Sequence, residues 1–241
     1  MSHSIFAIVG PVMVGPSSSH TAGAVRLGNV ARALFGELPE EVHIVLYSSF
    51  GEVYAGHGTD TALLAGVLGL SPSVPEIKQS FEIAEASGMQ FKIVPKPKAG
   101  KRYHPNTAKF YFTAGKRKMS VLGSSVGGGR IEIIRIDDMT VSFDGEHDVI
   151  IFTADTNTDV LSLIHDGIEG SGARLLQFFS TPKNNESTRF VIELSSTPTS
   201  LSSLLQKQES ISRISFIPHI SLWENVCQLP MAMQNKLNNS R

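Results

Sequence analysis

Residues 148–218 carry the pattern that most narrows the possible folds, because six short segments there alternate between the hydrophobic periods of strands and helices. Strands are predicted at 149–153, 174–180, 189–194 and 211–217, and helices at 159–169 and 200–208. The first helix places Val160, Leu163, Ile164 and Ile168 on one face. The order βαββαβ in about seventy residues predicts a ferredoxin-like domain and hence an α+β fold.

The sequence before this segment differs in composition, since residues 1–136 hold most of the Gly, Pro and His. Strands are predicted here at 5–9, 42–47, 110–113 and 131–136, and helices at 24–35 and 59–68. The polar, turn-rich residues 137–147 are interpreted as a linker, and residues 219–241 as a C-terminal tail. The predicted organisation is therefore a domain at 1–136, the linker 137–147, a domain at 148–218 and the tail 219–241.

Composition and charge exclude several classes of protein. Hydrophobic residues make up 41% of the chain and charged residues 18%, which excludes wholesale disorder. The formal net charge of −1 gives no reason to expect nucleic-acid binding. No apolar run approaches the roughly 20 residues that span a bilayer, and the N-terminus lacks the features of a secretion signal. We therefore expect a cytoplasmic protein that binds neither nucleic acid nor membrane.

The single cysteine, Cys227, limits the chemistry of the chain further. It cannot form an intrachain disulfide, which fits a reducing compartment. An iron–sulfur cluster takes about three or four protein thiolates, so this chain cannot hold one by itself. No pair of histidines has the His-x-x-x-His spacing of a zinc helix, so no metal site is predicted in this chain.

The first polar motif, Ser17-Ser18-Ser19-His20, lies in the turn that opens the predicted helix 24–35. Free backbone N–H groups and the positive end of the helix dipole favour a carboxylate or phosphate at such a place. The alternative is a serine-rich helix cap without a ligand.

Two further polar motifs accompany it. Gly56-His57-Gly58-Thr59-Asp60 opens the predicted helix 59–68, and His57 between two glycines has little core to pack against. Tyr103-His104-Pro105-Asn106 follows a basic loop, and a plain turn is the alternative there. Together the three motifs suit the binding and deprotonation of a small polar acid.

Four motifs in order carry a family resemblance: Gly-Pro-Ser-Ser-Ser-His-Thr-Ala-Gly at 15–23, Gly-His-Gly-Thr-Asp at 56–60, His-Pro-Asn-Thr at 104–107 and Val-Gly-Gly-Gly at 126–129. Together they closely resemble the β chain of bacterial iron–sulfur L-serine dehydratases, and the resemblance covers residues 4–218. It implies an allosteric-substrate-binding (serine dehydratase beta-chain) domain followed by an ACT domain, a regulatory amino-acid sensor with the βαββαβ layout.

The resemblance also implies an activity and a partner. The family converts L-serine to pyruvate and ammonia, a step of amino-acid catabolism and gluconeogenesis, with a [4Fe–4S] cluster held by a separate alpha chain. The chain would be a lyase subunit (L-serine ammonia-lyase), inactive without that alpha chain. The family motifs assign substrate binding to Ser17, Ser18, Ser19, His20, Thr59 and Asn106, and catalysis to His57 and His104. Which histidine does what stays open.

The ACT-like region departs from the family pattern at one loop. Residues 154–159 lack the Asp-x-Pro-Gly type sequence with which ACT domains bind amino acids, so a structural domain or one for β–β self-association is at least as well supported. The tail is expected to dock on the alpha chain or to fold back on its own sheet. The main alternative function is a stand-alone amino-acid-binding regulator without catalysis. A detached regulatory half of a hydroxy-acid dehydrogenase is weaker, because no Gly-x-Gly-x-x-Gly follows a strand.

Overall fold

The computed structural model describes residues 17–98 and 103–220. These residues divide into two compact units, one formed by the described residues up to Asp137 together with Ile220, and the other by Asp138–His219. The strand predicted at 5–9, Cys227 and nearly all of the tail lie outside the described residues. In the part of the chain that is described, no helix has the length and apolar character needed to cross a lipid bilayer.

The first unit is built on a sheet in which its own strands have the order β2-β1-β3-β4-β5. Its elements, in chain order, are η2 (Ser18–Ala22, a π-helical turn), α1 (Gly23–Phe35), β1 (Glu41–Tyr47), α2 (Ser48–His57), α3 (Thr59–Leu68), η3 (Pro75–Gln79, a 3₁₀ turn), α4 (Ser80–Ala86), β2 (Gln90–Lys96), β3 (Thr107–Ala114), β4 (Arg117–Gly127) and β5 (Arg130–Ile136). Strand β1 pairs with β2 in parallel and with β3 antiparallel, and β3, β4 and β5 pair antiparallel.

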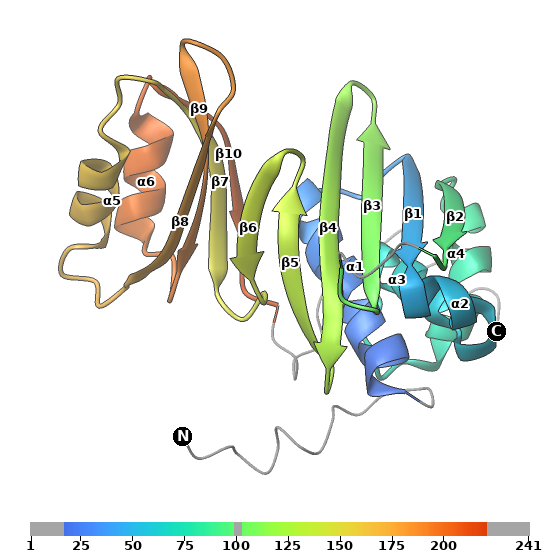
Figure 1. The fold of residues 1–241 in the computed structure, drawn as a ribbon. Coiled ribbons are helices and arrows are strands. Elements are labelled where there is room, and N and C mark those ends of the chain that lie inside the picture. Colours follow the sequence, from blue (N-terminus) through green and yellow to red (C-terminus); the bar gives the residue numbers. More distant parts are fainter. Residues whose placement is uncertain (1–16, 99–102, 221–241) are drawn as a thin grey trace. The chain divides into compact units, whose positions relative to one another are not determined.

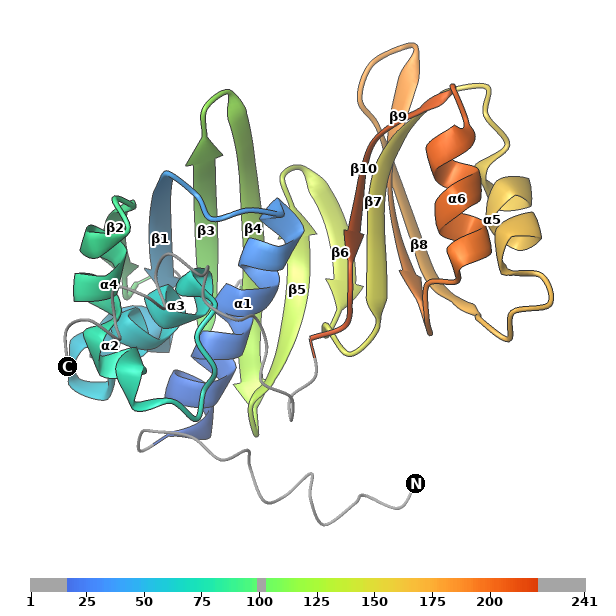
Figure 2. The same cartoon turned by 180° about the vertical axis from the view of Figure 1, so that it is seen from behind.

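Helices α1 and α3 cover one face of this sheet, as Figures 1 and 2 show from opposite sides. The apolar side chains of α1, such as Leu27, Val30 and Leu34, are fully or almost fully buried, and the helix ends at Gly36, whose φ of 92° is left-handed. The two helices approach closely through glycines. A Cβ on Gly66 would lie 2.0 Å from the carbonyl oxygen of Val25, and one on Gly28 would lie 2.4 Å from that of Leu63. A larger residue at either position would therefore push the backbones apart.

Sequence patterns locate several elements of this unit and miss others. The predicted helix 59–68 has the bounds of α3, and the predicted strands at 42–47, 110–113 and 131–136 correspond to β1, β3 and β5. Within the predicted linker 137–147, residues Met139–Phe143 form the strand β6, which belongs to the second unit. Their alternating burial shows that Met139, Val141 and Phe143 pack inward, which a free linker would not require.

The second unit has the predicted βαββαβ order. Its elements are β7 (Asp148–Asp155), α5 (Val160–Ile168), β8 (Leu175–Pro182), β9 (Ser187–Leu194), α6 (Thr199–Lys207) and β10 (Ile211–Ile217). They form an antiparallel sheet of order β10-β7-β9-β8, and apolar residues of α5 and α6 pack on its inner face (Figure 1). The Asp148 carboxylate, at the start of β7, accepts hydrogen bonds from the backbone N–H groups of Thr197 (2.8 Å) and His219 (2.9 Å).

Candidate functional site

The serine motif forms the entrance to α1. Ser17 is extended, with φ −137° and ψ 124°, and its hydroxyl accepts the backbone N–H of His20 at 3.1 Å. Ser17 therefore acts as a helix cap, which is the ligand-free role anticipated for this motif. Ser18 and Ser19 are half-buried in the first turn of η2, which continues directly into α1. Their hydroxyls thus lie at the positive end of a long helical segment.

His20 is the residue that joins the first two motifs. Its Nδ1 atom and the fully buried Thr59 hydroxyl share a hydrogen bond of 2.8 Å. Its ring packs edge-on against Phe50, with centroids 5.1 Å apart, and lies 5.2 Å from the ring of His57. Burial, and secondly the neighbouring His57, lower the pKa of His20 from its ordinary 6.5. His20 is therefore a neutral imidazole near pH 7.

The second motif is not the glycine-framed loop that the sequence suggests. Gly56 and His57 form the last turn of α2, which ends at Gly58 with a left-handed φ of 64°. The His57 side chain is exposed beside His20. Helix α3 does start at Thr59 as predicted, but Asp60 already places a carboxylate in its first turn. The Asp60 carboxylate therefore already occupies the positive end of this helix, which makes it less suited to an anionic ligand.

The third motif is a hydrogen-bonded turn tied to both α2 and β4. The Asn106 N–H donates to His104 Nδ1 at 3.2 Å, so a neutral His104 carries its proton on Nε2. The Pro105 carbonyl accepts the Phe50 N–H at 3.2 Å, and the Asn106 carbonyl accepts the Ser125 N–H at 2.9 Å. The local-turn reading is therefore correct for the backbone, while the His104 side chain stays exposed.

Two buried hydroxyl groups near these motifs escaped the sequence reasoning. Ser124 shares a 2.7 Å hydrogen bond with Thr107, whose hydroxyl also lies 2.6 Å from the His104 carbonyl oxygen. The Ser125 hydroxyl is buried, and no described residue hydrogen-bonds to it. It faces Gly23, where a Cβ would lie 2.0 Å from the Ser125 oxygen. Their position immediately before the Val-Gly-Gly-Gly motif is the sequence feature that could have identified Ser124 and Ser125.

The structure thus brings the motifs to one region of the first unit, by two kinds of contact. His20, His57 and Thr59 meet directly, whereas the 104–107 turn is connected through Phe50 and through the end of β4. Between described residues, no hydrogen bond or ring contact joins His104 to the other two histidines. The region combines a neutral imidazole, two exposed imidazoles and serine hydroxyls at a helix start, which suits a small polar acid.

Comparison with known proteins places this arrangement in one family. Residues 4–134 match the family described as serine dehydratase beta chain. The chain is 44% identical over 148 residues to the probable L-serine dehydratase beta chain of Bacillus subtilis (strain 168), an alignment that spans 61% of this chain and 66% of the relative. It is 38% identical over 183 residues to the L-serine dehydratase beta chain of Peptoniphilus asaccharolyticus, spanning 76% and 82% respectively.

A third relative is longer. The L-serine dehydratase of Mycobacterium bovis is 32% identical over 171 residues, which are 61% of this chain and 36% of that protein. In that relative, the part similar to this chain is therefore joined to a larger remainder of the same polypeptide.

Proposed function

Because the chain belongs to the serine dehydratase beta-chain family, we propose that it is the beta subunit of an L-serine dehydratase and supplies substrate-binding and acid–base residues to a site shared with an alpha chain. The observation that carries this proposal is the contact of His20 with Thr59 and His57, which unites two of the family motifs. The exposure of His57 and His104 supports it further, since a substrate can reach both rings.

The proposed reaction removes the α-proton and the β-hydroxyl of L-serine, which leaves as water. The resulting aminoacrylate becomes an imine, and its hydrolysis gives pyruvate and ammonia. The single cysteine of this chain cannot hold a [4Fe–4S] cluster, so we assign the cluster ligands to the alpha chain. When bound there, the cluster supplies a Lewis acid for the β-hydroxyl. The roles proposed below for the residues of this chain do not depend on the geometry of the cluster.

The residues of this chain are proposed to bind the substrate and to move its proton. The Ser18 and Ser19 hydroxyls, at the start of a helix, would bind the serine carboxylate. His57 would accept or return the α-proton, and His104, whose Nδ1 accepts the Asn106 N–H, would donate from Nε2 to orient the substrate. Ser17 and Thr59 keep other roles, since Ser17 caps the helix and Thr59 holds His20.

The experiment is anaerobic pyruvate formation from L-serine by the full chain, alone and with a co-expressed alpha chain. We expect activity in the pair alone, and we expect His57→Ala to lower turnover by about a hundredfold or more while leaving the absorbance of the cluster intact. His165→Ala, which changes an exposed histidine of the second unit, is the control and should keep full activity. A fully active His57→Ala complex would contradict the acid–base role.

The main alternative, an amino-acid-binding regulator, has one observation in its favour. A polar hollow of about 510 Å³ lies in the second unit where β7 meets α5, lined by Asp155, Asn157, Asp159 and Gln208 among others. L-serine binding to the isolated chain, without pyruvate formation in the pair, would favour this alternative.

The second unit is proposed to be an ACT domain used for β–β self-association. Its sheet ends in two edge strands, β8 and β10, and Leu176 on β8 is exposed. Sedimentation of the full chain over a range of concentrations tests this, because self-association predicts a mass that rises with concentration.

Docking of the tail on the alpha chain concerns residues outside those described, and truncation after His219 tests it.

A further inference from the structure

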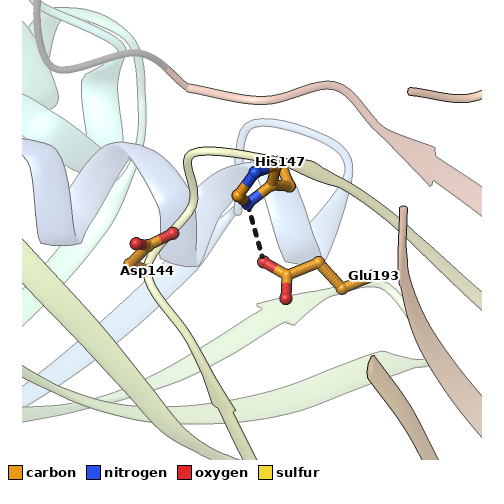
Figure 3. A group of neighbouring side chains, drawn as sticks. All are labelled: Asp144, His147 and Glu193. Carbon is orange, nitrogen blue, oxygen red and sulfur yellow. Dashed lines mark ion pairs between the residues drawn. The ribbon is translucent and has the colours of Figure 1, made fainter. Parts of the chain in front are cut away.

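Three side chains with metal-binding atoms meet in the second unit. None of them belongs to the motifs of the candidate site described above. Asp144 and His147 lie on the turn between β6 and β7, and Glu193 lies on β9. One potential ligand atom from each lies within 4.8 Å of the other two. Figure 3 shows His147 facing Glu193, with an Nδ1–Oε1 distance of 3.6 Å, and Asp144 on the adjoining turn. We call these three residues the 144/147/193 cluster.

The charge of this cluster is poorly balanced. The Glu193 side chain is only 5% exposed, and the second carboxylate, Asp144, stands beside it. Among the described residues, no lysine or arginine forms an ion pair with Glu193, and the ion pair that it does form is with His147, which is charged only when protonated. Burial raises the pKa of Glu193. A buried carboxylate without a permanent cation is costly, and a bound divalent cation would offset that cost.

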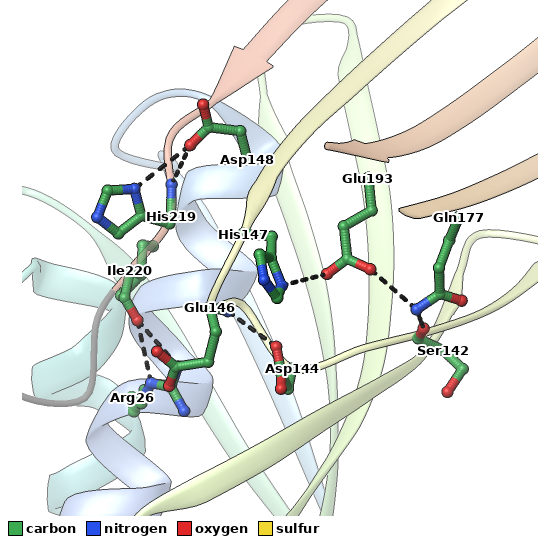
Figure 4. Close-up of polar contacts among 10 residues, drawn as sticks. All are labelled: Arg26, Ser142, Asp144, Glu146, His147, Asp148, Gln177, Glu193, His219 and Ile220. Atoms are coloured by element: carbon green, nitrogen blue, oxygen red, sulfur yellow. Dashed lines mark hydrogen bonds and ion pairs between the residues drawn. The ribbon is translucent and has the colours of Figure 1, made fainter. Parts of the chain in front are cut away.

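The carboxylate of Glu193 is also held in a defined orientation. Gln177 donates through Nε2 to Glu193 Oε2 at 2.9 Å and to the carbonyl of Ser142 at 2.6 Å, as Figure 4 shows. This leaves Oε1 directed at His147. Asp144 is fixed in turn, since its Oδ1 accepts the Glu146 N–H at 2.9 Å. Hydrogen bonds of this kind orient ligand atoms in metal sites.

We propose that Asp144, His147 and Glu193 bind a divalent transition-metal ion of the Zn²⁺ or Mn²⁺ class, which links the β6–β7 turn to β9. One imidazole and two carboxylates suit these ions, and water would complete the coordination. Metal–ligand distances of about 2.0–2.2 Å require ligand atoms about 3–3.5 Å apart. Exposed Asp144 and part-exposed His147 can close the remaining distance by side-chain rotation. The site contains no thiolate and is therefore separate from any iron–sulfur chemistry.

The test uses the full 241-residue chain stripped of metal with a chelator and titrated with Zn²⁺ at one fixed pH. Calorimetry and elemental analysis give the affinity and the number of ions bound per chain. We expect His147→Ala and Asp144→Asn each to weaken one binding event at least tenfold. Asp144→Asn keeps the oxygen that accepts the Glu146 N–H, so it changes the ligand without breaking the turn. In addition, Zn²⁺ should raise the thermal midpoint of the wild type and not of these variants.

A matched control lies in the same unit. His165 and Asp166 also have an Nδ1–Oδ1 distance of 3.6 Å, but their side chains are 76% and 61% exposed. His165→Ala should therefore leave the Zn²⁺ affinity unchanged. Should His147→Ala be unfolded by circular dichroism, the exposed Asp144→Asn variant decides alone. Equal Zn²⁺ stoichiometry and affinity in the wild type and in Asp144→Asn would overturn the proposal, as would the absence of any saturable Zn²⁺ binding by the wild type.

Discussion

The close approach of α1 and α3 makes Gly66→Ala a quantitative test of how rigidly the first unit is packed. The new Cβ would lie 2.0 Å from the Val25 carbonyl oxygen, whereas ordinary contact begins at 3.4 Å, and the opposing atoms are all backbone. Overpacking of this kind costs about 3 kcal/mol at the upper end of its usual range. Alanine recovers about 1 kcal/mol of helix propensity. The free energy of unfolding should therefore fall by about 2 kcal/mol, which lowers the thermal midpoint by roughly 4–8 °C.

Moving α1 and α3 apart in this way should also disturb the candidate site. Helix α1 follows directly from the turn that contains His20, and α3 begins at Thr59, so parting the two helices lengthens the 2.8 Å hydrogen bond between them. Urea unfolding followed by circular dichroism measures the stability, and pyruvate formation in the pair measures the site. Gly56→Ala is the stability control, because its added Cβ has no atom of the described residues within 4 Å beyond its own helix, and it should be neutral or stabilising. A Gly66→Ala chain as stable as the wild type would refute the reasoning.

Three further predictions concern single contacts. Thr59→Val removes the hydroxyl that shares a hydrogen bond with His20. It should lower the free energy of unfolding, measured with urea, by about 1–2 kcal/mol and kcat/KM by roughly tenfold. An unchanged kcat/KM would exclude a positioning role for Thr59. An NMR titration should give His20 a pKa below 6.5 that rises, without reaching 6.5, in His57→Gln. Because His20 then binds fewer protons in the folded than in the unfolded state, the free energy of unfolding should fall as the pH drops below about 6.5 towards the folded pKa. This fall should be smaller in His20→Gln. The same pH dependence in both proteins would contradict the lowered pKa. Asp159→Ala removes the carboxylate that accepts the Ser162 N–H at 3.1 Å and should destabilise α5 by about 1 kcal/mol, whereas Asp159→Asn should cost less in the same unfolding assay.

The elements that the sequence predicted well have strong periodicity and clear ends. Helix α3 is apolar almost all round and lies between Gly58 and Gly69, which both have a left-handed φ. Its bounds could therefore be predicted from the positions of these two glycines in the sequence. Helix α2 was missed, because glycines at 51 and 56 interrupt its pattern and its first residue, Ser48, has a positive φ of 46°. Strand β6 was missed, since the turn-forming residues on either side of it outweigh five alternating residues.

The candidate site was predictable as a set of motifs but not as a set of contacts. The order of the motifs identified the family, yet the hydrogen bond of His20 with Thr59 depends on how the η2 turn packs against α3. The 144/147/193 cluster shows the same limit, because the pairing of β7 with β9 brings Glu193 near a turn remote in sequence. Sequence spacing reports neighbours along one element, whereas the first of these contacts is set by helix packing and the second by strand register.

The hydrogen bond from His219 to Asp148 has a consequence for how the βαββαβ segment of the second unit can be joined to other sequence. It joins the last residue of that unit to the start of β7, and β7 and β10 are neighbouring strands (Figure 4). When entry and exit lie side by side, a short bridge closes them at little entropic cost. Such a segment tolerates circular permutation and insertion into a foreign host. The 148–219 segment therefore has the closely spaced ends that circular permutation and domain insertion require.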